Sequence, residues 1–207
     1  MLPRMSAEAP KKRLRPGRRP PSGLAHLRLR PVTGSELGTL VGHRRAMFEA
    51  IGGFSAEDLD RADPRYRRWV RGRLANGRAE AVLAWLDGAA IGSAVIWYRE
   101  DQPRPSSSAL RVPYLMSVYV DPAYRGRGIA TRLTEFLVAR ARTRGFPRVL
   151  LHASRFGRSV YARLGFERTW EMRWGGPYRS LPEGPERRRG RTFQGPGRRR
   201  SPRGRLR

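Results

Sequence analysis

The segment Arg125-Gly126-Arg127-Gly128-Ile129-Ala130 constrains the fold of this 207-residue chain more than any other feature. It follows an apolar run at residues 114–120, which predicts a strand that Asp121-Pro122 ends, and it opens a helix predicted over residues 128–144. Glycines at such a turn let backbone amides approach an anion without a Cβ in the way. The helix N-terminus adds unpaired N–H groups and a partial positive charge, and the two arginines can neutralise phosphates. We therefore expect a phosphate-bearing ligand at this turn.

Other phosphate-binding motifs do not fit this turn. No Lys-Ser or Lys-Thr pair completes a Walker loop, and both the third glycine and the acidic strand end of a dinucleotide fingerprint are missing. On this motif alone, a plain strand-to-helix turn in an arginine-rich chain remains an alternative.

The remaining sequence predicts an α/β fold. Alternating or continuous apolar runs predict strands at residues 24–30, 79–86, 91–98, 114–120, 148–153 and 167–174, and helical patterns cover residues 36–51, 64–74, 128–144 and 156–164. Asp87-Gly88 predicts a hairpin between the second and third strands. This order gives a mixed sheet with helices on both faces and a parallel crossover between the fourth and fifth strands.

Composition excludes several kinds of site. The chain has no cysteine, so disulfides, a cysteine nucleophile and a thiolate zinc site are excluded. His26, His43 and His152 show no close pairing, so we expect no metal. No stretch approaches the roughly 18 apolar residues of a membrane span, and no apolar segment of a secretory signal follows the basic N-terminus. We expect a cytoplasmic protein with no membrane partner.

The net charge of +27 is concentrated at the two ends of the chain. Arg-, Pro- and Gly-rich segments with few apolar residues cannot offset the entropy of ordering, so residues 1–23 and 179–207 are expected to be disordered basic tails flanking one domain at residues 24–178. Such tails can bind nucleic acid, but arginine supplies almost all of the positive charge, which codon bias also explains, and the tails offer only Phe193 for base stacking.

Two motifs resemble one family. Residues 118–130, followed by Leu133, resemble the signature Arg/Gln-x-x-Gly-x-Gly/Ala of the GNAT superfamily of N-acetyltransferases, and residues 161–166 are similar to its Tyr-x-x-Leu-Gly-Phe segment. The resemblance covers about residues 24–175. It implies a GNAT-like fold with six to seven mostly antiparallel strands and a parallel, splayed central pair. It also implies transfer of an acetyl group from acetyl-CoA to an amine, with no metal.

The resemblance further implies where acetyl-CoA binds. Backbone amides of the turn would hold the pyrophosphate, at Arg125, Gly126, Arg127, Gly128, Ile129, Ala130 and Thr131. The pantetheine arm would lie along Val118, Tyr119 and Val120 and pair with the main chain of the two valines. Ser154 stands where many members have an asparagine that bonds the pantetheine amide, and this departure leaves that contact open.

Tyr161 matches the family's usual general acid, which returns a proton to the coenzyme A thiolate; packing of the ring is its alternative role. The general base is open. His152 is the candidate we name, because its intrinsic pKa suits the task and it shares a strand face with Ser154. A histidine packed in the core, Glu49, Glu80 and ordered water are the alternatives.

The acceptor is also open. A small amine, an amino-acid or peptide α-amine and a protein lysine all fit. Candidates to line its pocket are Trp97, Tyr98, Trp170, Trp174 and Tyr178, for which a place in the core is the alternative. The protein is expected to be a monomer or a homodimer. A catalytically inactive acetyl-CoA-binding protein, or a nucleic-acid-associated protein that uses its arginine-rich tails, remains the alternative function.

Overall fold

The computed structural model describes Leu24, residues 26–103, residues 109–169 and Glu171. The strands are β1 (Arg28–Pro31), β2 (Ala79–Leu86), β3 (Ala89–Glu100), β4 (Arg111–Val120) and β5 (Leu150–Leu151). The helices are α1 (Leu37–Ile51), α2 (Ala56–Ala75), α3 (Ile129–Thr143) and α4 (Arg158–Arg163), with short 3₁₀ turns η1 (Gly34–Glu36) and η2 (Pro122–Tyr124).

The described strands form one mixed sheet in the order β1-β2-β3-β4-β5. Neighbours from β1 to β4 are antiparallel, and β4 and β5 are parallel. The predicted α/β class, with a mixed sheet and parallel fourth and fifth strands, is confirmed; among the described residues the sheet has five strands and β5 lies at its edge, so the parallel pair is not central there. The predicted hairpin is also present: Leu86 lies opposite Ala89, and Asp87 and Gly88 both have positive φ, as a type I′ turn requires.

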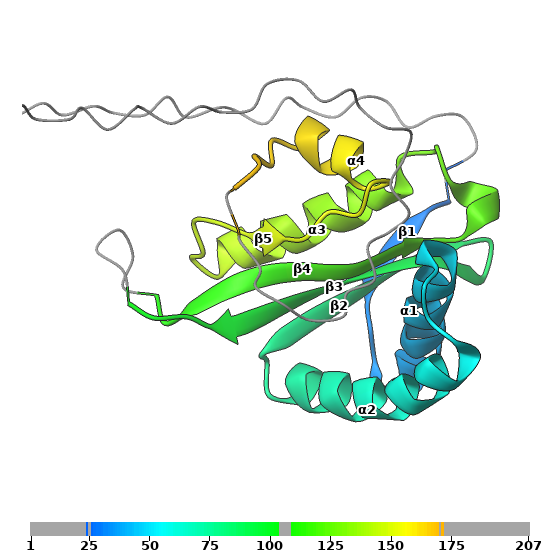
Figure 1. Cartoon of the computed structure of the whole chain (residues 1–207). Coiled ribbons are helices and arrows are strands. Elements are labelled where there is room, and N and C mark those ends of the chain that lie inside the picture. Colours follow the sequence, from blue (N-terminus) through cyan, green and yellow to red (C-terminus); the bar gives the residue numbers. More distant parts are fainter. Residues whose placement is uncertain (1–23, 25, 104–108, 170, 172–207) are drawn as a thin grey trace, which may run out of the picture. The chain divides into compact units, whose positions relative to one another are not determined.

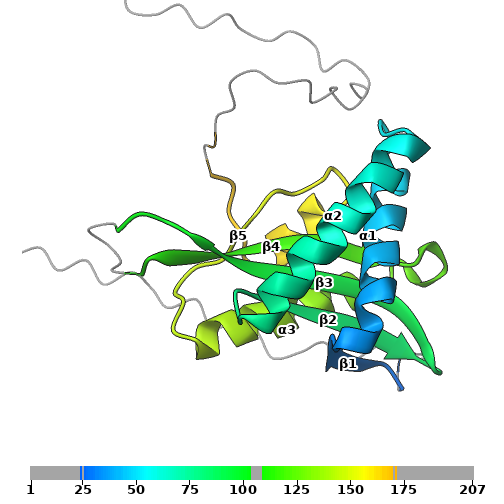
Figure 2. The same ribbon diagram turned by 90° about the horizontal axis from the view of Figure 1, so that it is seen from below.

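Helices cover both faces of the sheet. Figure 1 shows α3 and α4 on one side and α1 and α2 on the other, and Figure 2, seen from below, shows α1 and α2 next to each other in front of the strands. Successive strand residues point to opposite faces of the sheet. Residues of one strand therefore contribute to two hydrophobic cores, one beneath α3 and one beneath α1 and α2. On β3, Ile96 packs with Leu133 of α3, whereas Val95 packs with Leu40 of α1.

Helix α2 begins eight residues earlier than predicted. The prediction took Pro64 as the first turn, but the helix starts at Ala56 and contains Pro64. The Ser55 hydroxyl accepts from the Asp58 amide and the Asp58 carboxylate accepts from the Ser55 amide, so two donors at the helix start are satisfied. This reciprocal cap fixes the start of α2, and the exposed Pro64 is tolerated within it.

The ends of several other elements also differ from prediction. The first strand is confined to residues 28–31, and the fifth to residues 150–151. Residues 167–169 and Glu171 form no strand, and the rest of the predicted last strand lies outside the described residues. The predicted tails, Trp170, Trp174 and Tyr178 lie outside them as well. No helix in the described part of the chain has the length and apolarity to cross a membrane.

Candidate active site

The glycine-rich turn joins β4 to α3 and leaves the start of α3 without a cap. Gly126 and Gly128 have φ of 78° and 81°, a left-handed conformation that residues with a Cβ adopt only at a cost. Gly128 is the N-cap residue and offers no side chain, and no acidic residue stands in the first turn. Among the described residues, the amides of Ile129, Ala130 and Thr131 therefore have no acceptor. An anion is the natural partner of this helix end.

A bulge distorts β4 just before this turn. Ser93 of β3 lies opposite Tyr119 and Val95 lies opposite Met116, so two residues of β4, Ser117 and Val118, share one position. Ser117 has φ of 51°, which is unusual for a residue with a side chain. No pattern in the sequence signals this bulge.

Beyond the bulge, β4 presents an open edge. Pairing with β5 involves only Tyr114 with Leu150 and Leu115 with Leu151. The Asp121 amide donates to the Ile91 carbonyl, so the backbones of residues 121 and 119 face β3. By alternation, the main chains of Val118 and Val120 face the other way, toward the side that β5 leaves unpaired in the described structure. The main chains of the two valines therefore lie along an unpaired edge of β4 in the described structure.

Three other predicted residues of this segment make internal contacts. The Arg125 Nε donates to the Val120 carbonyl at 3.0 Å, which ties the turn to the end of the strand. A carbonyl has two lone pairs, so Val120 keeps one for a ligand. The Tyr119 ring packs on the α1 side, with its centre 4.9 Å from that of His43, and burial raises the pKa of Tyr119. Arg127 is exposed, and its guanidinium carbon lies 5.5 Å from the Tyr124 ring centre.

Tyr161 lies on α4 and packs against the core on the α3 side. Its ring meets Phe166 edge-on at 5.8 Å and touches Gly157 so closely that a Cβ there would lie 2.8 Å from Cε2. Burial raises the pKa of Tyr161 to about 12. The Tyr161 hydroxyl is therefore protonated at neutral pH. It has no hydrogen-bond partner among the described residues, so its O–H is free to donate to a ligand. Ser154 is used locally, since its Oγ accepts from the Gly157 amide at 3.2 Å.

His152 is hydrogen-bonded at both ring nitrogens. Its Nδ1 contacts the Tyr114 hydroxyl of β4, and its Nε2 lies 2.5 Å from Oε2 of Glu171. The histidine and glutamate side chains are 52% and 62% exposed, so His152 is not a core histidine. Sequence reasoning selected His152 but not Glu171, which lies 19 residues away with no motif to link them.

Two residues considered from sequence are held on the α3 side. Glu80 accepts from Tyr98 at 2.8 Å, from Arg140 at 2.5 Å and from Arg144 at 2.9 Å. Burial acts against ionisation, but the hydrogen bonds from Arg144, Arg140 and Tyr98 outweigh it and lower the pKa of Glu80. Glu80 therefore serves as an ion-pair anchor and not as a base. Tyr98, buried beneath α3, points away from its neighbour Trp97, which packs on Trp69 of α2.

The comparisons with known proteins agree with this geometry. The family model described as "Acetyltransferase (GNAT) family" matches residues 44–166, more than half of the chain. The chain belongs to this family. The matched span contains the glycine-rich turn, His152 and Tyr161, whereas Glu171 lies beyond it. A search of curated protein sequences finds no match.

Solved acetyltransferase structures resemble this chain. A GCN5-related N-acetyltransferase from Ralstonia eutropha JMP134 is 31% identical, with a TM-score of 0.66, over 72% of this chain and 97% of that one. A predicted acetyltransferase from Clostridium acetobutylicum, solved with acetyl-CoA, is 27% identical with a TM-score of 0.67, over 72% and 96%. An acetyltransferase from Trypanosoma brucei is 25% identical with a TM-score of 0.54, over 72% and 99%. The GNAT-like fold and the family resemblance are thereby confirmed.

Proposed function

We propose that this GNAT protein transfers an acetyl group from acetyl-CoA to a primary amine by direct attack in a ternary complex. The observation that carries the proposal is the uncapped start of α3 beside the open edge of β4. An anion site adjoins a row of free main-chain groups, and acetyl-CoA presents a pyrophosphate followed by an amide-bearing arm. The Clostridium acetobutylicum relative, which was solved with acetyl-CoA, supports the same donor.

On this proposal, the turn holds the pyrophosphate and the strand holds the arm. The amides from Gly126 to Thr131 bind the phosphate oxygens, and Arg127 adds a charge that is free to reorient. The main chains of Val118 and Val120 pair with the pantetheine amides as an added strand would. The Ser154 Oγ accepts a hydrogen bond from the Gly157 amide. Its O–H group and its second lone pair are left for a hydrogen bond to the pantetheine arm.

The bulge supports a role for β4 in the acyl transfer itself. When the amine attacks the thioester carbon, negative charge grows on the carbonyl oxygen until the C–S bond breaks. An N–H of the distorted segment that faces the open edge, that of Val118, can stabilise this charge without reorganisation. Strain at Ser117 fits such a role, because functional sites often hold unusual backbone conformations.

Tyr161 is our candidate for the proton that the departing thiolate takes up. With a pKa of about 12 its phenol is fully protonated at neutral pH and can act only as a donor. The pKa of the Tyr161 phenol exceeds that of an ordinary thiol by about three units. Proton transfer from Tyr161 to the coenzyme A thiolate is therefore uphill unless other groups stabilise the phenolate. Burial is the sole cause of the raised pKa of Tyr161, so on this proposal the bound substrates and solvent supply that stabilisation.

His152 is our candidate base. Because Glu171 is positioned to accept from Nε2–H, Nδ1 keeps its lone pair and can accept from the Tyr114 hydroxyl. The proton of the acceptor amine then passes to Tyr114 as the Tyr114 proton passes to His152. Glu171 neutralises the imidazolium that results. The arrangement follows the general logic of a base held in one tautomer by a carboxylate.

Ligand-induced stabilisation tests the donor site directly. We expect acetyl-CoA to raise the melting temperature of the full chain, whereas equimolar acetate plus pantetheine, which lacks the pyrophosphate, should not. An assay of free thiol with a panel of primary amines then reads out transfer. An absence of stabilisation at millimolar acetyl-CoA would contradict the proposal.

A further inference from the structure

An open cleft of about 540 Å³ lies along α2 and is bordered by Arg44 of α1. Both helices cover the face of the sheet opposite α3 (Figure 1). Arg44 of α1 contributes one wall, and α2 contributes the rest. Its charged lining consists of Arg44, Asp58, Arg61 and Arg65, and its rings are those of Tyr66 and Trp69. None of the residues assigned above to acetyl-CoA or to proton transfer lines this cleft.

Two contacts connect the cleft to the proposed transfer site. The Tyr66 hydroxyl is buried and faces Ser117 of the β4 bulge, although it makes no hydrogen bond of normal geometry within the described structure. Trp69 packs edge-on against Trp97 at 5.3 Å, and Trp97 lies opposite Tyr114 across β3 and β4. Tyr66 therefore connects the cleft with the bulge at Ser117. Trp69 connects it, through Trp97, with Tyr114, the partner of His152. These side chains stand between the cleft and the bulge and Tyr114, so a ligand reaches these groups along the Tyr66 and Trp69 rings.

Arg44 is held rigidly in the wall of this cleft. Its guanidinium carbon is 4.6 Å from the ring centre of Phe48 and 4.3 Å from that of Tyr66, and its side chain is only 18% exposed. Burial lowers its pKa, but a guanidinium remains charged at neutral pH. Its nearest carboxylate oxygen, on Asp63, is 3.9 Å from Nη1, and this nitrogen is buried without a hydrogen bond in the described structure. A fixed cation with unused donors favours an anionic ligand.

The surrounding charges favour a ligand with a single negative charge. Asp63 is bound to Arg45 at 3.0 Å, and Arg61 is neutralised by Glu57 and by Asp58 at 2.7 Å. Arg65 is exposed at the rim and has no acidic partner in the described part of the chain. Asp58 repels a dianion such as a phosphate monoester. One carboxylate can accept two hydrogen bonds from the Arg44 guanidinium and neutralise its charge. The charges of Arg61 and Arg65 are then balanced by those of Glu57 and Asp58.

We propose that this cleft selects the acceptor, and that the acceptor is a primary amine that also carries a carboxylate. The inference rests on the proposed function and extends it to the substrate class. The carboxylate binds Arg44, an aliphatic spacer lies along Tyr66 and Trp69, and the amine extends toward the β4 bulge.

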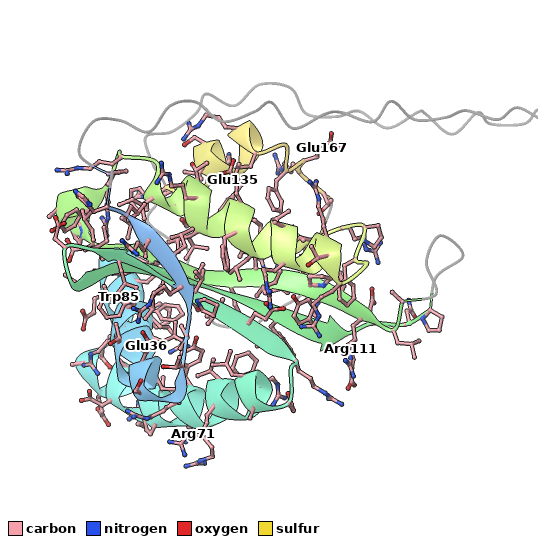
Figure 3. All side chains as sticks on the ribbon, turned by 180° about the vertical axis from the view of Figure 1, so that it is seen from behind. Glu36, Arg71, Trp85, Arg111, Glu135 and Glu167 are labelled. Carbon is pink, nitrogen blue, oxygen red and sulfur yellow. The ribbon has the colours of Figure 1, made fainter. Side chains whose placement is uncertain are left out.

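Matched pairs of acceptors test the proposal. With acetyl-CoA saturating, 6-aminohexanoate and 4-aminobutyrate are compared with their amides, which keep the amine and the spacer but lose the charge. We expect kcat/KM to be roughly 10- to 100-fold higher for the acids, the range of a charge-assisted hydrogen bond. Arg44→Gln should remove this preference mainly through KM. Arg71→Gln is the control, because Arg71 projects from the outer side of α2, away from the sheet (Figure 3), and should keep the preference.

A binding measurement makes every outcome informative. 6-Aminohexanoate should further stabilise the coenzyme A complex of the wild-type protein, and its amide should not. If acids and amides are acetylated equally, if O-phosphoethanolamine is preferred to both, or if the acids neither bind nor react while acetyl-CoA still stabilises the protein, the carboxylate proposal is wrong. Should acetyl-CoA itself fail to bind, the proposed function is wrong and not only this extension of it.

Discussion

His152 and Glu171 are joined by a 2.5 Å contact between Nε2 and Oε2, although they lie on segments on either side of α4. The contact orients the imidazole and directs its other nitrogen to Tyr114 of β4. A carboxylate in this position both selects the tautomer of a histidine and stabilises its charged form. Glu171 is therefore a positioning residue in the proposed base, and His152 acts through Tyr114.

Glu171→Gln tests this arrangement. We expect kcat to fall roughly 10- to 100-fold with little change in KM for either substrate, because the imidazolium loses its neutralising partner. His152→Ala should lose as much or more, and added imidazole should restore part of it. Glu167→Gln is the matched control, because this exposed acid is close in sequence (Figure 3) and should leave kcat unchanged. Full activity of both Glu171→Gln and His152→Ala would move the base to ordered water.

Tyr161→Phe should lower kcat by about 100-fold and leave the affinity for acetyl-CoA nearly unchanged, the pattern of a lost general acid. The melting temperature should stay the same, because the hydroxyl makes no hydrogen bond among the described residues. Since burial raises the pKa of Tyr161 to about 12, its proton stays in place from pH 6 to 10. Ionisation of Tyr161 therefore causes no fall in wild-type kcat at alkaline pH within this range. Unchanged turnover in Tyr161→Phe would leave the ring with a packing role only.

The sequence predicted those parts of the fold and the site that short-range patterns encode. The Asp87-Gly88 hairpin, the amphipathic face of α3 and the glycines of the turn each depend on neighbouring residues, and each lies where predicted. The start of α2 was missed because Pro64 was given more weight than the cap formed by Ser55 and Asp58. Arrangements that depend on distant residues had no sequence signal. The Ser117 bulge, the Glu171 partner of His152 and the rings that hold Arg44 follow from packing alone.

Gly128→Ala tests the anion site at the start of α3. With φ of 81°, an alanine at position 128 costs about 1–2 kcal/mol or shifts the amides that would bind the pyrophosphate. We expect acetyl-CoA to bind at least about 10-fold more weakly, measured by titration calorimetry. Gly145 has the same φ at the opposite end of α3, so Gly145→Ala carries the same backbone cost as a control. Equal effects of the two variants on affinity would assign the loss to destabilisation.

The proposed domain boundaries predict that the basic tails are dispensable for catalysis. Deletion of residues 1–22 and 182–207 should leave the melting temperature and the rate of acetyl transfer within about twofold of the full chain, because segments poor in apolar residues add little to a core. Scanning calorimetry and the thiol assay measure both quantities. An inactive but folded product would assign the tails a part in the acceptor site.

Glu80 should make the stability of the protein depend on pH in acid. Its folded pKa is lowered by Arg144, Arg140 and Tyr98, so its contribution is present above the unfolded value of about 4.3 and is lost as the pH falls through the folded value. Glu80→Gln should cost about 1–2 kcal/mol at pH 7, a range reduced because both arginines are partly exposed. Urea unfolding at pH 7 and at pH 3 measures the difference, which should shrink at the lower pH. Glu135→Gln on the exposed side of α3 (Figure 3) should show no difference at either pH, and a cost for Glu80→Gln that persists at pH 3 would point to lost packing instead of lost charge.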